Sequence, residues 1–148
     1  MKRILFTLMV CAIFSPAWAN QSLPSALYDG YWAMTEPSQG SYHVTKFIKN
    51  KDGNTIMQQY KFECLSGKKY RQNIKMTTAN LTSTEKGWLM NEKNLGEWAI
   101  LSITNLQANK SLDLLQTYTD KMPQFQTIFP NGLTLTYIHS PTLRPNCQ

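Results

Sequence analysis

The sequence predicts an all-β protein, most simply an antiparallel up-and-down barrel of about eight strands. Residues 55–63 alternate between two faces with a period near two, and residues 133–137 repeat this pattern. The pair Asp52-Gly53 favours a tight hairpin turn because both residue types accept a positive φ. The intervening segments lack long helical periodicity, which favours antiparallel connections over βαβ units. A β-sandwich of two sheets remains the alternative fold.

The predicted strands follow one another along the chain with turn residues between them. They span residues 30–36, 41–49, 54–64, 70–77, 81–84 with 88–90 as continuation or partner, 97–106, 111–118 and 133–140. Two prolines bracket residues 124–129, so the segment 120–130 is expected to form a crossing loop or a short extra strand. Closing eight strands into a barrel leaves no exposed edge, and the interior is filled by side chains or holds one small ligand.

The N-terminus has the pattern of a secretory signal peptide. Lys2 and Arg3 precede an apolar run over residues 4–14, and the small residues Ala17 and Ala19 follow it. We therefore expect residues 1–19 to be removed, leaving a single barrel domain over residues 20–148 in the periplasm or outside a bacterial cell. The net charge of +6 includes two positive charges from this leader. No later apolar run reaches the ~18 residues of a transmembrane helix.

The cysteines indicate one disulfide. Cys11 lies inside the leader, so the exported domain would keep only Cys64 and Cys147. In an oxidising compartment such a pair is most simply a bridge, which here would tie the end of the chain to its middle. A C-x-x-C redox motif is missing, so a structural role is favoured over catalysis by these thiols.

The start of the first predicted strand resembles a known family. Gly30-Tyr31-Trp32 is similar to the G-x-W signature of lipocalins and lipocalin-like bacterial barrels. The resemblance implies a barrel whose floor is closed by Trp32, with Arg144 packed over that tryptophan. It also implies a barrel mouth that takes a small apolar ligand. Thr119-Asp120 resembles part of a second family element, in which Lys121 replaces a tyrosine.

Large apolar side chains on the predicted strands form either a core or a ligand pocket. The candidate lining residues are Tyr60, Phe62, Trp98, Leu135 and Tyr137. Met57 would add adaptable apolar surface to such a pocket, but it falls on the polar face of its strand, which leaves simple exposure as the other interpretation.

The chain carries no recognisable catalytic motif. His43 and His139 lack metal-ligand spacing, and neither a G-x-S-x-G elbow nor a phosphate-binding glycine loop occurs. We therefore expect no enzyme activity, no cofactor, no metal and no nucleic-acid partner.

The sequence favours a binding module for a small apolar or amphipathic molecule. The alternative is a periplasmic inhibitor or immunity protein that binds a toxin or a cell-wall hydrolase. The ligand, the hollowness of the interior, the oligomeric state and the role of the basic hairpin tips stay open.

Overall fold

The structure is a computed structural model that describes residues 22–147, except for the side chains of residues 74 and 75. The predicted signal peptide over residues 1–19 lies outside these described residues. The predicted fold class is confirmed, since eight antiparallel strands form a closed barrel in sequence order and the last strand pairs with the first. The alternative of a two-sheet sandwich is wrong.

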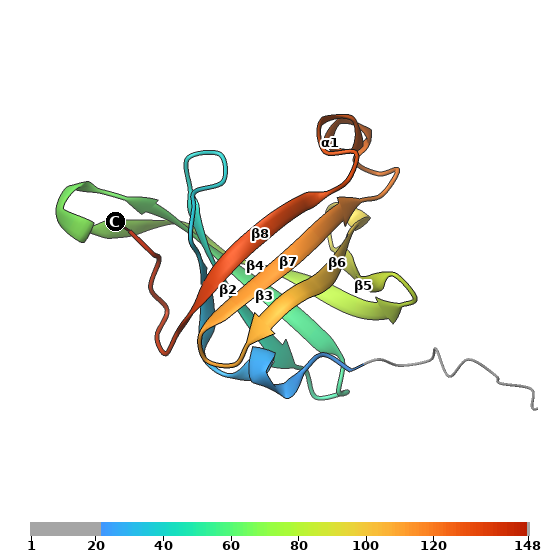
Figure 1. Cartoon of the computed structure of the whole chain (residues 1–148), viewed down its shortest axis with the longest axis horizontal. Coiled ribbons are helices and arrows are strands. Elements are labelled where there is room, and N and C mark those ends of the chain that lie inside the picture. Colours follow the sequence, from blue (N-terminus) through green and yellow to red (C-terminus); the bar gives the residue numbers. More distant parts are fainter. Residues whose placement is uncertain (1–21, 148) are drawn as a thin grey trace, which may run out of the picture.

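The strands differ in length, from four residues in β1 to fifteen in β4, and Figure 1 shows their arrangement. They are β1 (Tyr31–Met34), β2 (Tyr42–Lys49), β3 (Thr55–Cys64), β4 (Tyr70–Thr84), β5 (Gly87–Glu92), β6 (Gly96–Gln107), β7 (Ser111–Tyr118) and β8 (Leu133–Ser140). Within residues 22–147 three short helices accompany them: η1 (Ser25–Tyr28), η2 (Ser66–Lys68) and α1 (Pro123–Ile128).

Two predicted segments differ from the structure. Residues 70–77 and 81–84 form one strand, β4, because Ala79 between them pairs with Met57 and is buried in the interior. Residues 88–90 belong to β5, which is the partner of β4 and not its continuation. The segment 120–130 contains α1, where a loop or extra strand was expected. Pro123 stands at the start of that helix, a position that needs no backbone N–H.

Hairpin turns alternate between the two ends of the barrel. The closed end holds η1 and the turns at residues 50–54, 85–86 and 108–110. The open end holds the loops at residues 35–41, 65–69, 93–95 and 119–132, the last of which includes α1. In Figure 1, α1 lies at one end of β7 and β8 and η1 lies near their opposite ends.

The closed end is filled by an apolar core. Leu27 of η1 is fully buried beneath Trp32, whose indole Nε1 donates a hydrogen bond of 3.0 Å to the Leu27 carbonyl. Phe47 and Met57 pack in the same cluster with 2% and 3% of their surfaces exposed. The interpretation of Met57 as an exposed residue is therefore wrong, because the nominally polar face of β3 is the one that points into the barrel.

A second, smaller apolar cluster lies on the outside of β1 to β3. Ala33, Val44 and Phe62 are buried there, with Tyr60 and Leu143 packed against them. These strand residues alternate with the inward-facing ones, so they face outward. Leu143 belongs to residues 141–147, which we call the C-terminal strap. The strap thus hides apolar surface that the barrel wall would otherwise expose.

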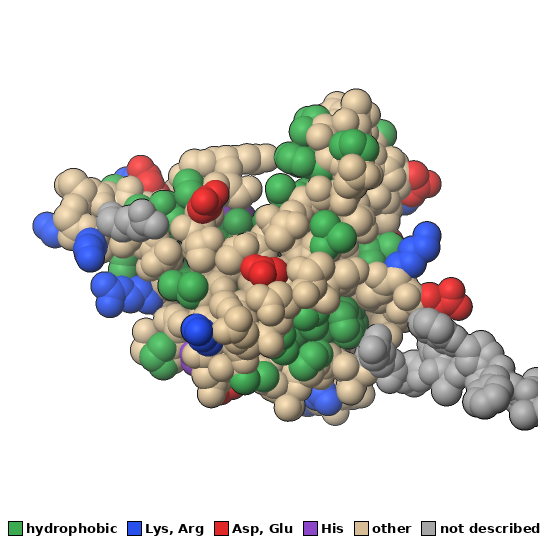
Figure 2. Space-filling model, in the orientation of Figure 1, with side chains coloured by type: hydrophobic (Ala, Val, Ile, Leu, Met, Phe, Trp, Pro, Cys, Tyr) green, Lys and Arg blue, Asp and Glu red, His purple; other side chains and the backbone are tan. Residues whose placement is uncertain are grey.

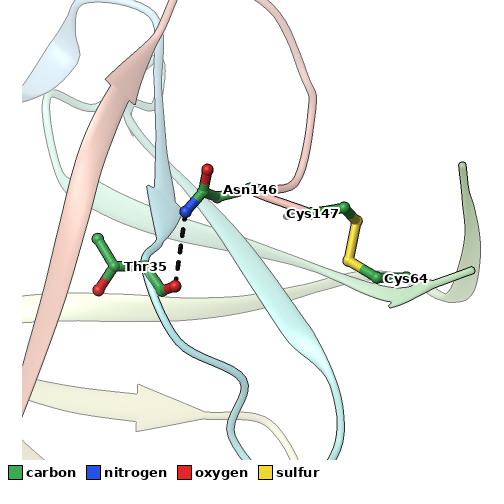
Figure 3. Close-up of a disulfide and its surroundings, with 4 residues drawn as sticks. All are labelled: Thr35, Cys64, Asn146 and Cys147. Carbon is green, nitrogen blue, oxygen red and sulfur yellow. Dashed lines mark hydrogen bonds between the residues drawn. A yellow bond between two sulfur atoms is a disulfide. The ribbon is translucent and has the colours of Figure 1, made fainter. Parts of the chain in front are cut away.

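The strap is fixed at its far end (Figure 3). Asn146 Nδ2 donates a hydrogen bond of 3.5 Å to the carbonyl of Thr35. The predicted disulfide between Cys64 and Cys147 is confirmed, with a Cα–Cα distance of 5.5 Å. Because β8 ends at the closed end and Cys64 lies at the open end, the strap runs the length of the barrel wall.

Candidate functional site

The open end of the barrel contains a cavity of about 220 Å³, which we call the cup. One side is aromatic and apolar, with Trp98, Tyr118, Phe125 and Leu135. The opposite side, on β2 and β3, is polar, with His43, Gln59 and Lys61, whereas Gln116 lies beside Tyr118 on β7. Tyr137, which is 1% exposed, also lines the cup and is part of the core cluster that fills the barrel. The barrel is therefore hollow at the open end and filled at the other.

A larger groove of about 620 Å³ adjoins the cup, and we call it the side groove. It lies between loop residues 35–39 and the segment that carries α1, and it shares Met34, Tyr118 and Leu135 with the cup. The groove exists because β1 stops early. Thr35 N donates to Thr136 O at 2.9 Å, and the pairing of β1 with β8 does not continue to residues 133–135.

Aromatic rings connect the cup to the side groove. The ring centroid of Tyr118 lies 5.1 Å from that of Phe125 and 6.2 Å from that of Phe129. Gln126 Nε2 donates to the Tyr118 carbonyl at 2.9 Å, which ties α1 to the end of β7. Figure 2 shows hydrophobic side chains gathered on and beneath α1. This helix therefore supplies an apolar wall that the strands alone would not provide.

Two residues that lie directly opposite each other on neighbouring strands form the polar side of the cup. His43 on β2 lies opposite Lys61 on β3, and both line the cavity. Burial lowers the pKa of His43, and the positive charge of Lys61 lowers it further. The imidazole is therefore neutral at pH 7. Across the cup, Gln116 Nε2 donates to the Tyr118 hydroxyl at 3.0 Å, and burial raises the pKa of that phenol.

The structure brings together three of the five predicted lining residues. Trp98, Leu135 and Tyr137 line the cup. Tyr60 and Phe62 do not, since they belong to the outer cluster under the strap. Alternation along β3 separates its two faces but does not show which face points into the barrel. The face with Tyr60 and Phe62 is apolar, which suggested that it points inward. It points outward instead, and the C-terminal strap covers it.

Sequence reasoning missed His43, Lys61 and Phe125 as cup residues. Lys61 lies on the same face of β3 as Met57. Once Met57 is known to point into the barrel, the alternation predicts that Lys61 points inward too. Phe125 carried no comparable signal, because its position depends on a helix of only six residues.

The predicted structural residues Gly30 and Trp32 lie at the closed end. Trp32 is fully buried, as a residue that closes the barrel floor should be. The ring that contacts its indole belongs to His139, with centroids 5.3 Å apart. Arg144 is exposed on the strap, so the expectation that it packs over the fully buried Trp32 is wrong. Arg144 belongs to the C-terminal strap, which runs along the outside of the barrel wall and not through its interior.

Within residues 22–147 no three His, Cys, Asp or Glu side chains come close enough to hold a metal ion. None of the helices described there is long and apolar enough to cross a membrane.

Comparisons of the chain with family models, with curated proteins and with solved structures gave no match.

Proposed function

We propose that the protein is a non-catalytic binding protein of the bacterial envelope whose cup and side groove hold a small amphipathic molecule. The observation that carries the proposal is the asymmetry of the barrel interior. Apolar side chains fill the closed end, whereas aromatic side chains at the open end surround a cavity that adjoins a groove. Concave sites with apolar walls and a few convergent polar groups are the usual form of small-molecule sites.

The sizes of the two cavities limit the ligand. The cup, at about 220 Å³, suits a headgroup or a single ring. The side groove, at about 620 Å³, lies within the usual range of roughly 300–1,000 Å³ for small-molecule pockets. A ligand with one end in the cup and its larger part in the groove would contact Tyr118 and Leu135, which line both.

Export and a lipocalin-like role have independent support. The leader pattern of residues 1–19, the disulfide and the Gly30-Tyr31-Trp32 motif at the start of a closed eight-stranded barrel agree with a small periplasmic or secreted carrier.

Titration with the neutral dye N-phenyl-1-naphthylamine tests the proposal. We expect dye fluorescence to rise on binding and tryptophan fluorescence to fall, because Trp98 lines the cup. Phe125→Ala should weaken dye binding by about tenfold, the loss typical of an aromatic anchor. Ile128→Ala is the matched control on the same helix, since Ile128 is 65% exposed. A folded protein that binds neither this dye nor apolar analogues would overturn the proposal.

A second candidate is a protein-binding module, the inhibitor or immunity protein of the alternative interpretation. Four of the large hydrophobic side chains that are exposed within residues 22–147 lie on open-end segments. They are Leu65 (42%), Tyr70 (40%), Leu95 (45%) and Ile128 (65%). Exposed apolar side chains at one end of a small domain are typical of partner surfaces. A stoichiometric partner that binds the native chain, and is lost from a Leu65→Ser and Ile128→Ser double variant that still binds dye, would favour this candidate, since neither residue lines the cup.

A further inference from the structure

The polar side of the cup has an uncompensated positive charge. We infer that the ligand of the cup is an anion, an apolar or aromatic molecule with a carboxylate, sulfate or phosphate group that pairs with Lys61. This inference depends on the proposed function and adds the chemistry of the polar end.

The position of Lys61 is fixed by the strand. Phe62 and Tyr60 face outward into the cluster under the strap, so Lys61 between them faces inward. The side chain is half-buried. Within residues 22–147 the salt bridge present joins Arg71 and Glu63 on the β3–β4 hairpin, and Lys61 has no acidic partner. An ammonium group that is partly removed from water without a counter-charge is unfavourable, and an anionic ligand would relieve that cost.

The other charged and titratable groups of the cup do not supply an anion. His43 is neutral at pH 7 because its pKa is lowered, and the phenols of Tyr118 and Tyr137 have raised pKa values. The carboxylate of Glu36 lies along the side groove and does not line the cup. Lys61 therefore sets the sign of the field inside the cavity.

One residue that lines the cup also has a hydrogen-bond donor without an acceptor among the described residues. The Nε1 atom of Trp98 is buried, and no described residue accepts a hydrogen bond from it. An indole N–H can only donate, so the missing partner must be an acceptor. Anionic oxygens are the strongest acceptors available to biological ligands. Because Trp98 Nε1 is closed to solvent in this structure, Lys61 carries the anion assignment, and an acceptor on the ligand would reach Trp98 Nε1 only with a shift of the indole ring.

Two dyes that differ by one sulfonate group provide the test. N-Phenyl-1-naphthylamine is neutral, and 8-anilino-1-naphthalenesulfonate is its anionic counterpart. We expect the anionic dye to bind at least about tenfold more tightly, as one half-buried ion pair would give. Lys61→Met should lower the affinity for the anionic dye at least about tenfold more than the affinity for the neutral dye, and Lys61→Arg should retain the preference. Lys110→Met is the control, since Lys110 is exposed in a turn at the closed end.

The outcomes separate the two levels of the proposal. If neither dye binds the folded native protein, the cup is not a ligand site and the proposed function fails. If both dyes bind equally, or if Lys61→Met weakens both to the same degree, the cup binds ligands but the anion assignment is wrong. Urea unfolding of each variant verifies that it is folded under the titration conditions.

Discussion

His139 packs edge-on against the indole of Trp32, with ring centroids 5.3 Å apart and planes inclined at 73°. The two residues are register partners on β8 and β1, so their contact lies at the seam where the barrel closes. Gly30 stands immediately before this seam with a φ of +59°, and an added Cβ there would lie 2.6 Å from His139 Nε2. A single rigid contact therefore couples the entry of the first strand to the last one.

Gly30→Ala should destabilise the protein by about 2–4 kcal/mol, because the positive φ and the clash with His139 both oppose a side chain. Urea unfolding followed by tryptophan fluorescence measures the change. Gly53→Ala is the matched control, since Gly53 also has a positive φ, of +81°, but open space around it. The free energy of unfolding of Gly53→Ala should fall by only about 1 kcal/mol. If both variants lost the same free energy of unfolding, the close contact between Gly30 and His139 would not be what limits residue 30 to glycine.

Replacing both Cys64 and Cys147 by serine should lower the free energy of unfolding by roughly 4 kcal/mol, because the disulfide closes a loop with a sequence separation of 83 residues. Chemical denaturation with and without a reductant measures it. Reductant should shift the native protein to the midpoint of the double variant and leave the variant itself unchanged. A reductant effect on the variant would show that the loss arises elsewhere.

Tyr137 should make the fold sensitive to alkaline pH. Burial raises its pKa to about 12 in the folded protein, against 10.0 for the ordinary side chain. Between these values the unfolded chain releases the phenol proton and the folded chain keeps it. Stability contributed by Tyr137 is therefore complete below pH 10 and declines by about 1.4 kcal/mol per pH unit as the pH rises toward 12. Tyr137→Phe should flatten this part of the profile in urea unfolding at successive pH values.

His43 should titrate below the ordinary histidine value of 6.5, chiefly because of burial and secondly because of Lys61. As the pH falls through 6.5, the unfolded chain takes up a proton that the folded chain resists, so stability decreases toward acid pH. Proton NMR of the imidazole measures the pKa directly. Lys61→Met should raise it only in part, since burial remains. A pKa at or above 6.5 in the native protein would contradict the proposed environment of the cup.

Much of the fold could be predicted because local signals agree with the final topology. Residues 111–118 and 133–140 match β7 and β8 at both ends, since alternating side chains and flanking turns define them locally. The cup could be predicted only in part. Phe62 looked like an inner residue because its burial depends on Leu143, 81 positions later and outside the alternating pattern. Alternation gives relative faces, whereas long-range contacts decide which face is covered.

Barrel closure also has a consequence for a chain made from its N-terminus. Neighbouring strands can pair as hairpins as soon as both have emerged, but β1 must wait for residues 137–140 before its second edge is satisfied. Until then Trp32 and the backbone edge of β1 remain open to other chains. Vectorial synthesis thus exposes this edge for longer than any other in the barrel. Loss of β8 by truncation would leave it permanently available for aggregation.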